Sequence, residues 1–268
     1  MKSSPAVTPL EAANRPDLGG AFSMPIYSPM LAAPPPYRYK DTLSLNIVFK
    51  TDPDLLERLT PPPLKPNTNH LMIFYIGFFQ FADYDLSYHE AGLLIPVTHS
   101  GQNGTYPIVL YLDQVNPIVG GREIYGWPKK EADEILFKEE EGKISASVTR
   151  YGYQIIETSF EALQTVDPIP ERAIEPMFTL KVIPSALKGA PPDVFKLISS
   201  CNDPDVITKM TVGNAALKFG ASPYDDILAR IEIQEITYAE LIKHDFTMGN
   251  GELVVDYLSS SQETGHEN

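Results

Sequence analysis

Two adjacent lysines, Lys129 and Lys130, follow the only tryptophan of the chain, Trp127, and a proline. A lysine amine can attack a carbonyl carbon and form a Schiff base, but only in its unprotonated form, and free lysine has a pKa of about 10.4. Burial in apolar surroundings or a second cation nearby lowers that pKa. Because Trp127 and Lys130 supply both conditions locally, Lys129 is a candidate for covalent catalysis.

The same segment also fits a surface turn that carries two solvated lysines, so that alternative stays open on chemistry alone. If the segment is extended, adjacent side chains point to opposite faces. One lysine would then enter the apolar interior while the other stays wetter. Arg122 and Glu123 lie just upstream, where an ion pair that shapes the loop is as reasonable as a contact with substrate.

Other kinds of reactive site find little support in the sequence. We expect the histidines to be solvated and expect no metal site, because no His-x-x-x-His pair is present. A single cysteine cannot form an internal disulfide and fits a reducing compartment, so a cytoplasmic protein is the default. The sequence contains no Gly-x-Ser-x-Gly turn and no Gly-x-Gly-x-x-Gly; we read Gly120-Gly121 as a turn.

Composition excludes several classes of protein. The chain has 35 acidic and 21 basic residues and a formal net charge of −14, which argues against a nucleic-acid partner. No signal peptide is visible. Leu71–Phe79 is the most apolar run, and its nine residues are too few for a membrane span of about 20, so we expect no membrane partner and read the run as a buried strand.

The elements that must position these residues are mostly strands. Asp52 or Thr51 can cap a short helix that has Pro53 at its first position. A second short helix is predicted at 193–199. Strands are predicted at 43–49, 71–81, 92–99, 105–112, 134–138, 143–149, 151–160, 178–183, 229–236 and 252–258, and Asn103-Gly104 is predicted as a hairpin turn.

These elements predict a mainly β fold of the α+β class, an antiparallel barrel-like core with a few short helices. The 25 prolines of the chain agree with short segments, because an interior proline disrupts a helix. We expect an extended proline-rich arm at 1–36, one domain at 37–258 and a polar tail at 259–268.

The segment GGREIYGWPKK resembles the signature of the acetoacetate decarboxylase family, Gly-Arg-Glu-hydrophobic-x-x-aromatic-Pro-Lys-Lys. The resemblance covers roughly residues 36–258. Further segments similar to those of the family follow in the same order, namely Asn46–Asp52, Ile95–Val97, Tyr111–Asp113, Leu180–Pro184 and Val255–Leu258.

The resemblance implies roles for individual residues. Lys129 matches the lysine that forms the imine in the family, and Lys130 matches the lysine beside it. Glu90 stands where the family has an active-site glutamate, although by residue type alone it would be a solvated loop acid. Arg122 and Trp127, which also match the motif, are expected to contact the substrate.

Two positions depart from the family pattern. The family's decarboxylases are similar in having an arginine shortly before the first strand, where it can meet the substrate carboxylate, and this chain has Thr42 there. Arg38 and Lys40 are close enough to supply a shifted cation. A second active-site glutamate is replaced by Tyr75, so we expect a pocket that is less charged and more apolar or phenolic.

Three functions follow as hypotheses. The first is a cofactor-free lyase that decarboxylates acetoacetate or a related β-keto acid through an iminium on Lys129. The second, motivated by Thr42 and Tyr75, is a Schiff-base aldolase-dehydratase that joins pyruvate or another keto acid to an aldehyde. The third is a non-catalytic barrel that binds an apolar ligand. The resemblance also implies a homo-oligomer and a small-molecule keto acid as substrate.

Overall fold

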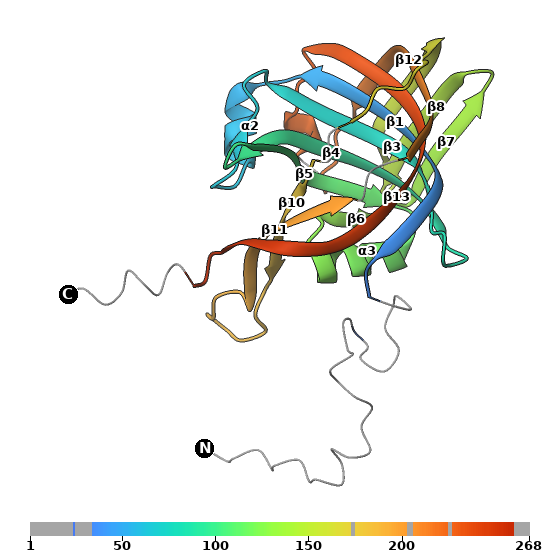
Figure 1. The fold of residues 1–268 in the computed structure, drawn as a ribbon. Helices are drawn as coiled ribbons and strands as arrows, with labels where there is room; N and C mark the ends of the chain where they lie inside the picture. Colours follow the sequence, from blue (N-terminus) through green and yellow to red (C-terminus); the bar gives the residue numbers. More distant parts are fainter. Residues whose placement is uncertain (1–23, 25–33, 173–174, 203–205, 225–226, 260–268) are drawn as a thin grey trace, which may run out of the picture.

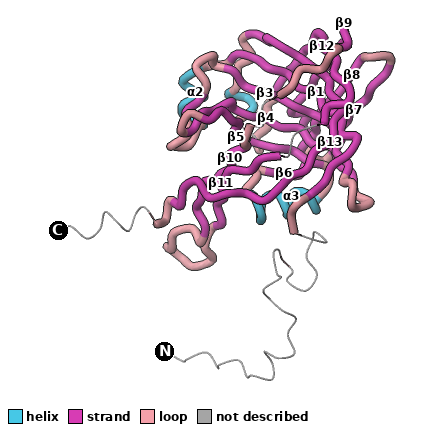
Figure 2. Tube along the Cα trace, viewed as in Figure 1, coloured by secondary structure: helices cyan, strands magenta, loops and turns pink. Residues whose placement is uncertain are grey.

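The computed structural model of the protein describes residue 24 and residues 34–172, 175–202, 206–224 and 227–259. Nearly all of the expected arm at 1–36 and of the expected tail at 259–268 lies outside these residues. Figure 2 shows that strands dominate the described part and that helices are short.

The strands, in chain order, are β1 (Tyr37–Lys50), β2 (Lys65–Pro66), β3 (Leu71–Gln80), β4 (Ser87–His99), β5 (Gln102–Leu112), β6 (Lys129–Glu131), β7 (Glu134–Glu140), β8 (Lys143–Arg150), β9 (Tyr153–Thr165), β10 (Met177–Ile183), β11 (Val194–Asn202), β12 (Val206–Phe219) and β13 (Glu235–Asp256). The helical segments are α2 (Pro53–Leu59), α3 (Val115–Gly120), the π-helix η2 (Gly121–Tyr125) and the 3-10 helix η3 (Leu228–Arg230). No helix in the described ranges is long and apolar enough to cross a membrane.

The strands form one sheet in the order β1-β3-β4-β5-β10-β11-β13-β12-β9-β8-β7. The long strand β13 also pairs with β1, so β1, β3, β4, β5, β10, β11 and β13 close into a ring (Figure 1). Most pairings are antiparallel; β5 pairs in parallel with β6 and, at one residue pair, with β10. The predicted mainly β, barrel-like class is confirmed.

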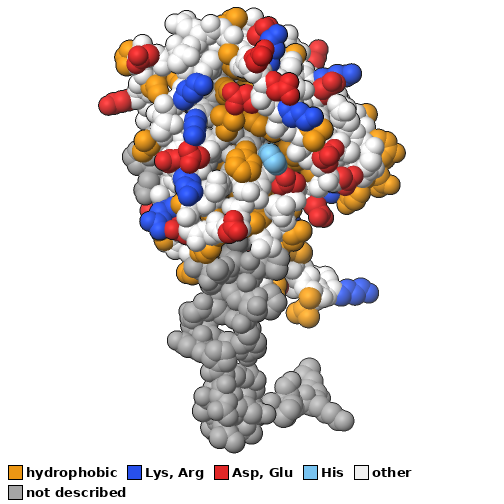
Figure 3. Space-filling view, turned by 90° about the vertical axis from the view of Figure 1, so that its right-hand side faces the viewer, with side chains coloured by type: hydrophobic (Ala, Val, Ile, Leu, Met, Phe, Trp, Pro, Cys, Tyr) orange, Lys and Arg blue, Asp and Glu red, His pale blue; other side chains and the backbone are white. Residues whose placement is uncertain are grey.

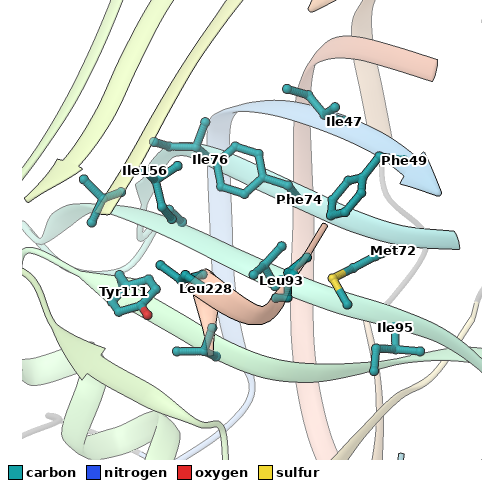
Figure 4. Close-up of a cluster of buried hydrophobic side chains, with 14 of the residues drawn as sticks. Ile47, Phe49, Met72, Phe74, Ile76, Leu93, Ile95, Tyr111, Ile156 and Leu228 are labelled. Carbon is teal, nitrogen blue, oxygen red and sulfur yellow. The ribbon is translucent and has the colours of Figure 1, made fainter. Parts of the chain in front are cut away.

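Alternate residues of the same strands build two different environments. Leu45, Ile47 and Phe49 of β1 point into the main hydrophobic core and are fully buried. Ser44, just before Leu45, and Asn46, between Leu45 and Ile47, line a cavity on the other face of the strand. Because side chains alternate along a strand, one run of sequence serves both the core and the cavity. Figure 4 shows the core side chains that β1, β3 and β4 contribute.

The hairpin between β4 and β5 is confirmed, but the predicted turn position is wrong. The turn is Ser100-Gly101, whose φ angles of 49° and 82° suit a tight hairpin. Asn103 and Gly104 lie inside β5. A Cβ on Gly104 would be 2.4 Å from the carbonyl oxygen of Pro176, so this glycine serves the close approach of the chain before β10.

Two predicted elements near the C-terminus are also wrong. The predicted helix at 193–199 is strand β11, which pairs with β10 on one side and β13 on the other. The predicted strand at 229–236 is replaced by η3, whose Leu228 is fully buried in the core, and β13 starts only at Glu235. The sequence reading missed β12. For β11, pairing with two other strands overrides the local pattern.

The helix α2 is confirmed. The side chain of Asp52 accepts a hydrogen bond from the backbone N–H of Asp54 at 3.0 Å, and Pro53 occupies the first turn. On the face of the molecule shown in Figure 3, acidic and basic side chains are interspersed. The net negative charge of the chain is therefore not gathered into one acidic patch on this face.

Candidate functional site

A continuous helical segment, α3 followed by η2, leads into the lysine pair. The two glycines read as a turn from sequence, Gly120 and Gly121, are both helical. Gly126 ends the segment in the left-handed conformation, with φ of 79°. A Cβ at Gly126 would lie 2.4 Å from Cα of Lys181, so glycine is required there by both conformation and space.

Three backbone contacts fix the position of Lys129. Strand β6 pairs in parallel with β5, with Leu110 opposite Lys129. The N–H of Leu110 donates to the carbonyl of Pro128 at 3.1 Å. Arg122 Nη1 donates to the carbonyl of Lys129, also at 3.1 Å. Arg122 therefore holds the backbone of the lysine, and it is not among the described residues that line the cavity.

The two lysines face opposite sides, as the extended conformation predicts. Lys129 is only 7% exposed and lines the cavity, whereas Lys130 is half-buried and is not among the lining residues. The Lys129 ammonium position lies over two rings, 5.6 Å from the ring centre of Tyr88 and 5.9 Å from that of Trp127. Lys130 can act on the cavity only through its charge.

The structure brings together three of the expected site residues. Lys129 Nζ lies 2.9 Å from Oε2 of Glu90, which is 6% exposed. The other carboxylate oxygen, Oε1, accepts a short hydrogen bond from the phenol of Tyr75. Burial and the neighbouring Glu90 raise the pKa of Tyr75 well above its usual value. Tyr75 is therefore a protonated donor at neutral pH.

A glycine makes room for this arrangement. Gly92 on β4 stands opposite Tyr75 on β3. A Cβ at Gly92 would lie 2.6 Å from the Tyr75 ring and 2.4 Å from the side chain of Leu110. The small residue thus lets the phenol lie across the sheet and reach Glu90.

The cavity beside these residues has a volume of about 240 Å³. Of the expected site residues, Tyr75, Glu90, Trp127 and Lys129 line it, and Thr42, Arg122 and Lys130 do not. The indole N–H of Trp127 is buried and has no hydrogen-bond partner among the described residues. An unpaired buried N–H costs about 1–3 kcal/mol, so a ligand that offers it an acceptor would gain affinity.

Thr42 is fully buried on β1, and its strand partner on β13 is His244. Neither Arg38 nor Lys40 takes the place of the arginine that the family's decarboxylases have at the position of Thr42. Arg38 pairs with Asp83 at the surface, and Lys40 is exposed. Of the described residues, neither Arg38 nor Lys40 lines the cavity.

Sequence reasoning missed several residues that line the cavity. They are Tyr39, Ser44, Asn46, Tyr88, Arg172 and His244. The expectation that all histidines are solvated is wrong for His244, which is 8% exposed because β13 places it on the inner face. Ser44 and Asn46 could have been predicted as lining residues, because side chains two residues apart on a strand share a face and Thr42 was already an expected site residue. Nothing in the local sequence identifies Arg172, which the connection between β9 and β10 carries.

A larger hollow of about 1060 Å³ is open to solvent over β7, β8, β9 and β12. It contains none of the expected site residues. We therefore place the candidate active site in the smaller cavity, where a lysine, a glutamate and a phenol are in contact.

Gly121→Ala should disturb this site without disturbing the fold. A Cβ there would lie 2.7 Å and 2.8 Å from Cδ and Cε of Lys129, which is flexible enough to move aside. A misplacement of about 1 Å can cost about 10²-fold in rate, so we expect a loss of that order in kcat/KM with an unchanged unfolding temperature. Gly249→Ala is the matched control, since its nearest new contact is 3.8 Å away. Equal activity of the two variants would contradict the placement of Lys129.

Comparison with known proteins shows the family of the chain. Residues 23–258 match the model of the family described as acetoacetate decarboxylase. The acetoacetate decarboxylase of Burkholderia multivorans is 34% identical over 250 residues, which cover 89% of this chain and 96% of the relative. The crystal structure of acetoacetate decarboxylase from Legionella pneumophila superposes with a TM-score of 0.73 at 26% identity, covering 89% of this chain and 95% of that one.

The fold is also similar to that of the enduracididine biosynthesis enzyme MppR in complex with the condensation product of pyruvate and imidazole 4-carboxaldehyde. The TM-score is 0.77 at 20% identity, over 88% of this chain and 97% of that one. The family match spans most of the chain. The chain belongs to the acetoacetate decarboxylase family.

Proposed function

We propose that the protein is a cofactor-free Schiff-base lyase that decarboxylates acetoacetate or a closely related β-keto acid. The chain is an enzyme of the acetoacetate decarboxylase type, and the reaction and substrate are our proposal. The observation that carries it is the contact of Lys129 Nζ with Glu90, 2.9 Å apart in a buried cavity beside aromatic rings. The expectation of a purely ligand-binding barrel is set aside because the family is enzymatic.

The proposed reaction begins with the neutral amine of Lys129. Its lone pair attacks the ketone carbon, and the resulting carbinolamine loses water to form an iminium. The bond to the carboxylate carbon then breaks, carbon dioxide leaves, and the electron pair moves into the iminium to form an enamine. Protonation at carbon followed by hydrolysis releases the ketone and restores the lysine.

Glu90 is positioned to transfer protons during these reaction steps. Its carboxylate can take a proton from the lysine ammonium before attack and return one during hydrolysis. Tyr75 holds the other carboxylate oxygen and so fixes its orientation. Trp127 and Tyr88 supply ring faces that stabilise the positive charge of the iminium.

Borohydride reduction in the presence of acetoacetate tests this proposal directly. We expect the wild-type protein to gain the mass of one isopropyl group on Lys129, located by peptide mass spectrometry, and to release carbon dioxide at a steady rate without borohydride. A protein that gains no mass under these conditions would show that the Schiff-base mechanism is wrong.

The aldolase-dehydratase reaction is the second candidate. Tyr75 supports it, because the family's decarboxylases have a glutamate at this position and the neutral phenol leaves the cavity with one acidic group fewer. MppR shows that this fold can hold the condensation product of pyruvate and an aldehyde. Assays of carbon dioxide release from acetoacetate and of pyruvate condensation with an aromatic aldehyde separate the two. Rapid decarboxylation without condensation rejects the second candidate.

Two further expectations remain predictions. The resemblance implies a homo-oligomer, which light scattering of the purified protein would measure. A cytoplasmic location also remains a prediction.

A further inference from the structure

We propose that Arg172 binds the carboxylate of the substrate, in place of the arginine that the family's decarboxylases have at the position of Thr42. This inference rests on the proposed function, since it identifies the substrate of that site as a small carboxylate-bearing carbonyl compound. The carbonyl would lie at Lys129 and the carboxylate at Arg172.

The first argument is the composition of the cavity wall. Of its described lining residues, only Arg172 and Lys129 are arginine or lysine. Lys129 must react with the carbonyl carbon, so it cannot also be the carboxylate partner of the same molecule. The remaining wall combines apolar side chains such as Phe79 and Leu94 with polar side chains, among them Asn46 and His244, that do not carry the fixed positive charge of an arginine. A buried anion needs a charged or strongly donating partner, and Arg172 can provide it.

The second argument is that Arg172 is held in place. Its Nη2 donates to Oε2 of Glu240 at 2.5 Å, and Glu240 is 3% exposed. Glu240 in turn accepts from Asn46 Nδ2 at 3.1 Å and from the phenol of Tyr238 at 2.9 Å. A guanidinium fixed by a buried, hydrogen-bonded carboxylate loses little side-chain entropy when it binds a ligand.

The third argument is position and size. The side chain of Arg172 is 40% exposed while that of Lys129 is 8% exposed, so the arginine lies toward the mouth and the lysine toward the interior. A cavity of about 240 Å³ is below the range of about 300–1,000 Å³ typical of drug-sized ligands, which suits a small keto acid. A keto acid would then enter with its carbonyl first.

The experiment compares a charged ligand with a neutral one. Acetoacetate carries a carboxylate, whereas pentane-2,4-dione is a neutral β-diketone that can also form an imine with Lys129. Because Trp127 is the only tryptophan and lines the cavity, its fluorescence reports occupancy whether or not a covalent bond forms. Because the active enzyme consumes acetoacetate, dissociation constants of both ligands are measured in a Lys129→Met background, alone and combined with Arg172→Gln, Arg172→Lys or Arg38→Gln.

We expect Arg172→Gln to weaken acetoacetate binding by about tenfold to hundredfold, the range for one lost hydrogen bond to a charged group, and to change dione binding less than about twofold. Arg172→Lys should fall between, because lysine keeps the charge without the planar fork. Arg38→Gln, which removes a surface arginine outside the cavity lining, should leave both constants unchanged. Equal weakening of both ligands, or unchanged acetoacetate binding, would overturn the proposal.

A double variant separates carboxylate binding from simple neutralisation of Glu240. Arg172→Gln combined with Glu240→Gln removes the uncompensated buried acid. In the same Lys129→Met background, we expect this double variant to bind acetoacetate weakly. Recovery of the affinity measured with Arg172 and Glu240 both present would show that Arg172 only balances Glu240. Failure of the Schiff-base proposal would instead appear as absence of borohydride-trapped mass while the fluorescence titrations still report the role of Arg172.

Discussion

Replacing Lys129 by methionine should lower kcat/KM for decarboxylation of acetoacetate by about 10⁴-fold or more, since the covalent route needs the amine. Methionine has similar length and suits the apolar surroundings, so the cavity keeps its shape. The expected readouts are loss of carbon dioxide release and loss of the borohydride-trapped adduct. Retention of either one would show that another residue forms the covalent bond.

Lys130→Met is the matched control for this prediction. Lys130 does not line the cavity, so its removal should change the rate by about tenfold at most, through the loss of a neighbouring charge. The adduct should still form. A loss as large as that of Lys129→Met would show that the assignment of the two lysines is reversed.

Folding of the Lys129→Met variant must be checked because it leaves Glu90 buried without its cation. Breaking a buried pair by removing one partner is strongly destabilising. The double variant with Glu90→Gln removes that charge and should recover thermal stability. It should recover no activity, which distinguishes the loss of chemistry from the loss of fold.

Glu90→Gln should reduce kcat by about 10²–10⁴-fold, the usual contribution of a positioned general acid or base. Glutamine keeps the size of the side chain and can still accept a hydrogen bond from Tyr75, but it cannot carry a proton at neutral pH. Imine formation should slow together with turnover, measured by stopped-flow spectroscopy of the adduct with pentane-2,4-dione. Turnover within about threefold of the wild type would exclude the proposed proton transfer by Glu90.

Tyr75→Phe provides the comparison for Glu90. Burial and Glu90 raise the pKa of Tyr75 well above its usual value, so the phenol stays protonated from neutral to moderately alkaline pH. Its loss should therefore lower the rate about tenfold at every pH in that range, as one lost hydrogen bond to a charged group does, without moving the alkaline limb of the rate profile. If Tyr75→Phe removes the alkaline limb of the pH–rate profile, the phenol itself titrates in that pH range.

Local patterns predicted part of this fold well. The cap at Asp52, the alternation along β8 and the apolar run of β3 each depend on residues close together in the chain, and each predicted element is present. The predicted helix at 193–199 failed because β10 and β13, which are distant in sequence from one another, pair on both sides of it. Strand pairing of this kind has no local signal.

The sequence by itself predicted which residues form the candidate site and which reaction they could carry out. The Trp-Pro-Lys-Lys segment and the resemblance built around it identified Lys129, its aromatic neighbour Trp127 and the acid Glu90. The sequence also predicted that one of the two lysines points inward if the segment is extended, because adjacent side chains of an extended backbone point to opposite faces.

Only the tertiary structure decided which other groups share the cavity. Tyr75 donates a hydrogen bond to Glu90 because Gly92 leaves room for the phenol. Arg122, expected from sequence to contact the substrate, instead donates to the backbone of Lys129. Arg172 lines the cavity. The physical reason is that closure of the sheet through β1 and β13 sets distances between residues far apart in sequence. Residue types define which reactions are available, and the closed sheet defines which residues can take part in one.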